Sequence, residues 1–434
     1  MKYFKKNFFY LLLSILIVLL IYIFYKSEIY WQGSQREYYF KYFIFISFLI
    51  FFLNICFFYI SRKYNIYLII ILSSIFFSLY LFEGFIKINN NILTINKKIK
   101  LNQKQQKEYD TRTKIEIYND LKKKTSNTTV VIGAGNYISN NNLPILPLSG
   151  KSYSQTIHCN EQGYYSIYKS DRYGFNNPDN EWDKKEIKYF LIGDSFPHGA
   201  CVKEKNDIAS FLRVLSRESS LNLGYVGNGP LSEYAILREY LKPNVKNIIW
   251  FFYEANDTED LLNELKSEIL NKYLKDGSYS QNLIFKQNLI DQLAEEEIKK
   301  WHGQYKVKTN LTEFSRFIKL SDLRTTIFPP RRAKLNDKFR VIMELTKKIA
   351  TENNSNLYFV YLPQYQSINK QNSNLYYEVK NIIESLNITF IDIKKEVFDK
   401  ERDPFKLFPF SLNGHYNEDG YKKIATVIKK AINN

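Results

Sequence analysis

Three long, predominantly apolar stretches stand at the beginning of the chain, and no charged residue interrupts any of them. They are Phe8–Tyr25, Tyr42–Ile60 and Ile66–Phe82. A helix needs roughly 20 apolar residues to cross the hydrocarbon core of a bilayer, and shorter spans down to about 17 occur. The pattern therefore predicts a membrane anchor of three transmembrane helices in residues 1–87.

After the anchor, short apolar runs alternate with segments of helical periodicity. The predicted strands are residues 188–192, 221–225, 246–253, 356–362 and 388–392, and residues 422–432 have the spacing of an amphipathic helix. This alternation predicts a three-layer α/β/α domain with a mostly parallel sheet over residues 151–434. In such domains ligands bind at the carboxyl ends of the strands.

Two segments depart from the alternation. Residues 88–150 are rich in Lys and Asn, with Gly and Pro near the end, and predict a polar stalk and linker. Residues 258–336 interrupt the domain with a long insertion rich in helix formers. A lid over the substrate, a packing subdomain and a docking surface for a partner are equally open interpretations of this insertion.

Basic residues predict the orientation of the anchor. They precede the first stretch and fill the tight turn between the second and third, at Lys2, Lys5, Lys6, Arg62 and Lys63. The positive-inside tendency then sends everything after Phe82 to the outer side. Basic residues in the first loop oppose this, but long soluble domains translocate largely regardless of charge. Because no small-residue cleavage site follows Tyr25, we expect an anchor rather than a removable signal peptide.

The net charge of +17 does not indicate a nucleic-acid partner. Lys, Asn, Ile, Tyr and Phe are abundant along the whole chain, so the basic balance is a matter of general composition rather than of a basic patch. A local excess from Lys87 to Lys100 could touch anionic headgroups. A solvated linker is the preferred interpretation of this excess.

Four blocks carry candidate chemistry, three of them directly after predicted strands. Ser195 stands in the run Leu191-Ile192-Gly193-Asp194-Ser195-Phe196, where an apolar strand ends in a small turn with a hydroxyl. Gly227 and Asn256 follow the next two strands, and His415 precedes the last helix. A serine hydroxyl needs an adjacent base, for which His415 is the candidate, and the negative oxygen of the intermediate needs hydrogen-bond donors.

In this order the four blocks resemble the SGNH/GDSL hydrolase family, over roughly Lys184–Asn434. The resemblance implies a flavodoxin-like α/β/α fold, a nucleophile at Ser195 and a base at His415, without a cofactor or metal. It assigns the oxyanion hole to the amides of Ser195 and Gly227 and to the carboxamide of Asn256. One departure is small: Ala255 stands where the family usually has glycine.

The larger departure concerns the acid that orients the base. The family places an aspartate three residues before the histidine, and this chain has Leu412 there. A backbone carbonyl, the remote Asp403 or the nearby Asn413 are the candidate substitutes.

The remaining histidines and cysteines suggest no metal site. His158 and His302 lack ligand-like spacing, and His198 is expected to be a solvated helix residue or to line the mouth of the pocket. Cys56 lies within a predicted span. Cys159 and Cys201 could form a disulfide if the domain is exported, but their spacing does not decide it.

The resemblance implies a membrane-anchored serine esterase or O-acyltransferase acting on acyl, chiefly acetyl, esters of envelope or surface glycans. We expect it in a bacterial inner membrane, as a multi-pass protein with its soluble domain in the periplasm. Three spans are too few for a fused membrane acyltransferase, so an acyl relay would need a separate membrane partner. The alternatives are a catalytically degenerate domain that binds glycan or scaffolds an export complex, and a plain lipase or thioesterase with a lipid substrate.

Overall fold

The computed structural model describes residues 2–31, 33, 35–59, 62–104, 109–138, 140, 143–328 and 334–433. The chain forms two compact units. The first consists of Met1–Asn96 with Lys306–Lys334, and the second consists of Lys97–Tyr305 with Leu335–Asn434. The insertion that the sequence assigns to residues 258–336 is thus divided between them.

Three apolar helices build most of the first unit. Helix α1 (Lys2–Phe24) continues into a π-helical turn (Tyr25–Tyr30) and packs on α2 (Arg36–Tyr59), where the rings of Phe9 and Phe57 stack at 3.9 Å. Helix α3 spans Arg62–Lys104. The segments Phe9–Tyr30, Arg36–Tyr59 and Ile70–Asn89 are long and apolar enough to cross a membrane. The three predicted helices are thereby confirmed, although Ile60, the predicted end of the second, lies outside the described residues.

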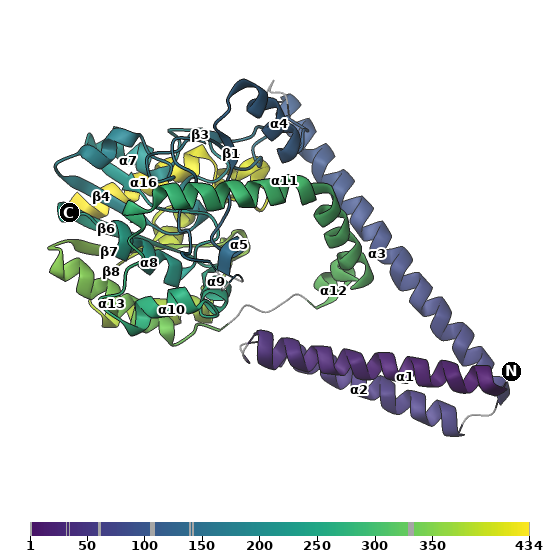
Figure 1. The fold of residues 1–434 in the computed structure, drawn as a ribbon. Coiled ribbons are helices and arrows are strands. Elements are labelled where there is room, and N and C mark those ends of the chain that lie inside the picture. Colours follow the sequence, from purple (N-terminus) through teal and green to yellow (C-terminus); the bar gives the residue numbers. More distant parts are fainter. Residues whose placement is uncertain are drawn as a thin grey trace. The chain divides into compact units, whose positions relative to one another are not determined.

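The second unit is built on a parallel sheet, which confirms the predicted fold class (Figure 1). Its strand order is β5-β4-β6-β7-β8, and every neighbouring pair is parallel. The order reverses at β4, because the chain first adds β5 on one side and then β6, β7 and β8 on the other. The strands are β4 (Ile187–Ile192), β5 (Ser220–Asn222), β6 (Val245–Tyr253), β7 (Asn356–Leu362) and β8 (Thr389–Asp392).

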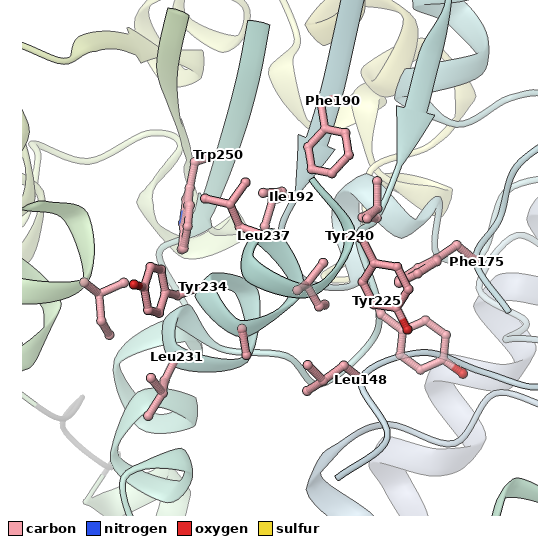
Figure 2. Packing of buried hydrophobic residues seen from close by; sticks show 14 of the residues in the cluster. Leu148, Phe175, Phe190, Ile192, Tyr225, Leu231, Tyr234, Leu237, Tyr240 and Trp250 are labelled. Atoms are coloured by element: carbon pink, nitrogen blue, oxygen red, sulfur yellow. The ribbon is translucent and has the colours of Figure 1, made fainter. Parts of the chain in front are cut away.

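Helices cover both faces of this sheet because the strand residues alternate between two apolar clusters. Leu191 and Ile249 pack with α7 (Ile208–Ser216) and α16 (Glu418–Asn433). Phe190 and Trp250 instead join the cluster of Figure 2. The helices on that face are α8 (Pro230–Tyr240), α13 (Lys338–Glu352) and α14 (Asn374–Ser385).

The other α-helices are α4 (Lys114–Lys124), α5 (Gly135–Ile138), α6 (Ser195–His198), α9 (Asp257–Glu264), α10 (Glu268–Lys275), α11 (Gln287–Ile318), α12 (Ser321–Ile327) and α15 (Ile393–Glu396). Short 3-10 turns are η2 (Asp179–Asp183), η3 (Leu283–Phe285), η4 (Tyr365–Ser367), η5 (Phe398–Lys400), η6 (Pro404–Leu407) and η7 (Pro409–Ser411).

A second, three-stranded sheet precedes the main one. Strand β1 (Thr128–Val130) pairs in parallel with β2 (Gln155–Ile157), and β2 pairs antiparallel with β3 (Ile167–Lys169). Part of the segment predicted as a polar linker therefore has regular structure. Leu148 in that segment is fully buried in the main core (Figure 2). The few apolar residues of the segment are thus used for packing, although turn-forming residues surround them in the sequence.

Candidate active site

Ser195 stands on a tight turn at the carboxyl end of β4. The strand ends at Ile192, and α6 begins at Ser195 itself. The side chain of Asp194 caps this short helix by accepting a hydrogen bond from the amide of Phe196 at 3.0 Å. Burial raises the pKa of Asp194, although hydrogen bonds from Phe196, Ser195 and Asn256 act in the opposite direction. The turn thus holds the Ser195 hydroxyl at the strand end, and the residue as a whole is only 7% exposed.

His415 meets that hydroxyl from the loop before α16. Its Nε2 lies 2.9 Å from Ser195 Oγ, and its ring packs on Phe196 with the centroids 4.8 Å apart. The residues are 220 positions apart in the chain. The fold therefore brings the predicted nucleophile and base to hydrogen-bond distance.

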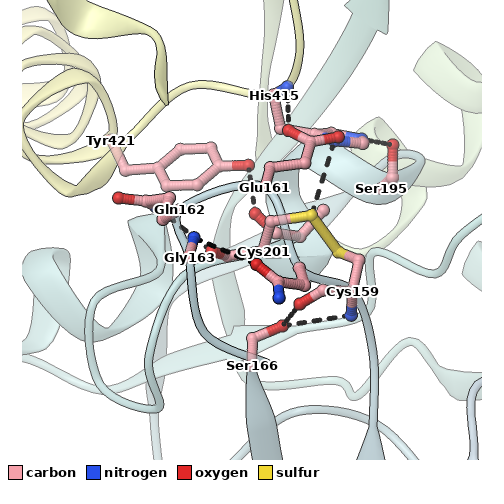
Figure 3. Close-up of a disulfide and its surroundings, with 11 residues drawn as sticks. Cys159, Glu161, Gln162, Gly163, Ser166, Ser195, Cys201, His415 and Tyr421 are labelled. Carbon is pink, nitrogen blue, oxygen red and sulfur yellow. Dashed lines mark hydrogen bonds and ion pairs between the residues drawn. A yellow bond between two sulfur atoms is a disulfide. The ribbon is translucent and has the colours of Figure 1, made fainter. Parts of the chain in front are cut away.

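The acid at His415 is Glu161, which no sequence argument singled out (Figure 3). Its Oε1 lies 3.0 Å from His415 Nδ1, and its Oε2 accepts the backbone amide of His415 at 2.7 Å. An ionised carboxylate can only accept, so it favours the tautomer with the proton on Nδ1. The lone pair on Nε2 is then directed at Ser195, which is the arrangement of a serine, histidine and acid triad.

Neither of the two residues predicted as substitutes, Asp403 and Asn413, orients the ring of His415. The carboxylate of Asp403 accepts the amide of Phe405 at 3.2 Å and caps η6 instead. Asn413 is exposed. The family pattern has its acid three residues before the histidine, whereas Glu161 precedes the nucleophile in the chain. The one available signal was the proximity of Glu161 to Cys159, a candidate for cross-linking.

A disulfide fixes the loop that carries Glu161. Glu161 lies in the hairpin between β2 and β3, and Cys159 in the same hairpin is bonded to Cys201, just beyond α6. Gln162 adds a hydrogen bond from its Nε2 to the Cys201 carbonyl at 3.1 Å. Figure 3 shows Glu161 between this disulfide and His415. Potential metal-ligand atoms of Glu161, Cys201 and His415 also lie within 4.8 Å of one another. A disulfide sulfur is not a thiolate, however, and Glu161 and His415 are hydrogen-bonded to each other in the triad.

The two remaining candidates follow the strands next to β4. Gly227 lies in a turn closed by the hydrogen bond from the Asn228 amide to the Tyr225 carbonyl, and its φ of +76° strains any other residue. Asn256 is the N-cap residue of α9, directly after β6, and its Nδ2 donates to Asp260 at 2.7 Å. Strands β4 and β6 flank the point where the strand order reverses, which is where open α/β sheets bind ligands.

His198 is fully buried, which contradicts the expectation of a solvated helix residue. Its Nδ1 accepts the amide of Val226 at 3.2 Å, so Nε2 carries the proton and donates to Tyr168 Oη at 2.8 Å. Burial lowers the pKa of His198 to about 3, so the ring is neutral near pH 7. Its contribution is to hold the turn that contains Gly227. Of the other two histidines, His158 is buried against this ring, and His302 contacts Asn119.

Four further acids cluster on α8 and α9, next to Asn256: Glu233, Asp257 and Glu264 are buried, and Asp260 is half-buried. Burial raises the pKa of Asp260 to about 8 and that of Glu264 to about 7. Burial also raises the pKa of Glu233 and Asp257 well above the usual range, with the neighbouring carboxylates adding to the effect. Glu264 accepts the amides of Gly229 and Leu231 and so fixes the start of α8. The raised pKa values favour the protonated forms of these acids near neutral pH.

Comparison with known proteins adds little to what the geometry of the site shows. No protein-family model and no curated protein matches the chain. Among solved structures, one described as a lipolytic protein of the G-D-S-L family, from Desulfitobacterium hafniense DCB-2, is similar with a TM-score of 0.29 and 13% identity. The match covers 56% of this chain and 99% of the other. Because so low a TM-score supports no inference, a hydrolase assignment depends on the geometry of Ser195, His415 and Glu161.

Proposed function

We propose that the protein is a serine esterase or O-acyltransferase of the SGNH type. The observation that carries this proposal is the pair of hydrogen bonds in series, 2.9 Å from Ser195 to His415 and 3.0 Å from His415 to Glu161. A serine hydroxyl becomes a nucleophile when a base takes its proton, and the base works best when an acid holds its ring and tautomer.

The reaction begins when Ser195 Oγ attacks the ester carbonyl and its proton passes to His415 Nε2. Glu161 stabilises the resulting imidazolium through the hydrogen bond to Nδ1. The negative oxygen of the tetrahedral intermediate is assigned to the amides of Ser195 and Gly227 and to the carboxamide of Asn256. His415 then protonates the departing alcohol, leaving an acyl group on Ser195. Water or a sugar hydroxyl, deprotonated by His415, releases that acyl group.

The proposed substrate is an acyl ester of an envelope or surface glycan, with the soluble unit in the periplasm. Two observations support this setting: the three apolar helices, and the Cys159–Cys201 disulfide, because disulfides persist in oxidising compartments. A separate membrane acyltransferase remains the proposed donor if the acyl group is transferred rather than hydrolysed.

A degenerate domain that only binds or scaffolds is the competing function, and its main support was the absent acid at position 412. Glu161 supplies a carboxylate from another part of the chain, so that support is gone. A domain that only binds or scaffolds would also have no use for a nucleophile and a base at hydrogen-bond distance.

Intact-mass spectrometry of the full chain in detergent tests the chemistry directly. After incubation with an aryl ester or a fluorophosphonate, we expect one adduct on the native protein and none on Ser195→Ala. An adduct on both proteins would remove Ser195 as the nucleophile. A folded native protein with no adduct from either reagent would favour the scaffold.

A further inference from the structure

The distal part of the insertion belongs to the same compact unit as the apolar helices. We call residues 306–328 the return segment; it comprises the end of α11 and all of α12. The chain thus leaves the apolar helices through α3, builds most of the second unit and then comes back to them. No part of the proposed reaction explains this return.

A buried carboxylate on α3 holds the return segment. Glu83 is fully buried, and its two oxygens accept the backbone amides of Asp322 and Leu323 at 2.9 and 2.7 Å, in the first turn of α12. An ionisable group inside a span is costly unless it is paired, and the free amides at a helix N-terminus are suitable partners. Glu83 lies within the candidate span Ile70–Asn89, so the pairing specifically joins this segment to that span.

Further contacts place the return segment along the last part of the same span. Tyr80 Oη donates to the Ile318 carbonyl at 2.9 Å, and Lys87 forms an ion pair with Glu313 at 2.7 Å. The ring of Phe328 also meets that of Tyr42 near the start of α2, with the centroids 5.9 Å apart. The return segment therefore packs beside the C-terminal end of the span on α3 and the N-terminal end of the span on α2.

The return segment is amphipathic, and the other residues that the structure describes leave its apolar side exposed. Val307, Leu311, Phe314 and Ile318 follow a spacing of four, three and four residues, so they form one stripe on α11. Leu311 and Phe314 are 62% and 64% exposed. The opposite side of the helix carries Lys308, Thr312, Arg316 and Lys319.

We propose that the return segment lies in the headgroup region of the bilayer, with its apolar stripe toward the acyl chains and its basic side toward anionic headgroups. An apolar stripe opposite a basic face is the pattern of helices that lie in a membrane interface. The return segment contacts Tyr80, Glu83 and Lys87 in the last part of a candidate span, so its apolar stripe would lie at the boundary between headgroups and acyl chains. The insertion thus supplies a second membrane contact rather than a lid. This inference does not depend on the proposed reaction.

Fluorescence quenching on the full chain in lipid nanodiscs tests the proposal. Leu311→Cys and Phe314→Cys would each be introduced with Cys56→Ser, which leaves only the disulfide cysteines, and labelled with a polarity-sensitive dye without reductant. Thr312→Cys on the opposite face of the same helix is the matched control. In discs of phosphatidylcholine and phosphatidylglycerol, we expect nitroxide-bearing lipids to quench positions 311 and 314 several-fold more strongly than position 312. Aqueous iodide should show the reverse order.

Each other result counts against a lipid neighbour. Equal iodide access at positions 311, 312 and 314 would show that the stripe faces water or that the helix is lost. Shielding of 311 and 314 from both quenchers would show that protein covers the stripe. In a fourth labelled protein, Phe314→Cys combined with Glu83→Ala, the loss of the anchoring carboxylate should raise iodide access at position 314. Unchanged access would remove Glu83 as the anchor.

Discussion

Glu161 determines which nitrogen of His415 carries the proton, and this can be tested with an isosteric change. Glu161→Gln keeps the size of the side chain but removes the charge that stabilises the imidazolium, and its amide can stabilise the wrong tautomer. We expect kcat for an aryl ester to fall by about 10³ to 10⁴-fold, as for other triads that lose their acid. Asp403→Asn is the matched control and should leave kcat unchanged. The opposite pattern would return the orienting role to Asp403.

Gly414 offers a gentler perturbation of the same contact. A Cβ at this position would lie 2.6 Å from Glu161 Oε2, so Gly414→Ala must push the carboxylate away from His415. Because that oxygen ends a flexible side chain, the fold should tolerate the change. A displacement near 1 Å costs about 10²-fold in rate. Gly277→Ala, where the added Cβ meets nothing within 4 Å, is the control. Equal rates for both variants would show that Glu161 does not need its observed position.

The residues of the site differ in how far the sequence reveals them. Ser195 and His415 stand beside recognisable elements, a strand end and a C-terminal helix, and both were predicted. Glu161 gave no such signal, because it lies in a hairpin loop whose position over the sheet is set by tertiary contacts. The burial of His198 was missed for the same reason: its partners Tyr168 and Val226 come from distant segments.

At the scale of elements, the hairpin between β2 and β3 depends on its disulfide. The two cysteines are 42 positions apart, so by loop-closure entropy their bond stabilises the fold by about 4 kcal/mol. Reduction should lower the unfolding free energy by that order and also slow acylation of Ser195, because the loop that carries Glu161 is released. The rate of adduct formation with and without reductant measures this. Cys56→Ser should respond to reductant as the native protein does, and an unaffected rate would make the bond purely structural.

Among the elements, the strands of the main sheet were the most predictable. Parallel strands that are buried on both faces appear in the sequence as nearly continuous apolar runs, and here these runs end at small or polar residues. The segment before residue 150 was harder, since its buried residues, such as Leu148, are scattered among turn formers. The division of the insertion was beyond sequence reasoning, because α11 is one continuous helix and nothing in its periodicity indicates that its two halves join different units.

At the scale of the whole molecule, the buried acids on α8 and α9 should make stability depend on pH. Their pKa values are raised by burial, to about 7 for Glu264 and about 8 for Asp260. The native state therefore keeps protons that the unfolded chain has lost above about pH 4.3. The stability that these acids contribute is fully present below that pH and declines as the pH rises toward and through their folded-state pKa values.

Glu233→Gln tests this linkage at the acid whose oxygens have no hydrogen-bond partner among the described residues. The variant cannot lose a proton there, so its stability relative to the native protein should grow with pH above pH 5, by up to about 1.4 kcal/mol per pH unit. Thermal unfolding midpoints in detergent from pH 5 to pH 8 measure the difference. The exposed Glu218→Gln should follow the native profile. Parallel profiles for Glu233→Gln and the native protein would contradict the linkage.

The return of the chain to Glu83 also changes what a protease can do to the molecule. A single cut between residues 104 and 114 breaks the chain between α3 and the second unit. Residues 306–328 remain part of the larger fragment, however, and still contact the apolar helices. A nicked molecule should therefore sediment with membranes as the intact one does. Retention then rests on the return segment, through its contacts with α3 around Glu83 and through its proposed contact with lipid, so shedding of the soluble unit would require a second cut.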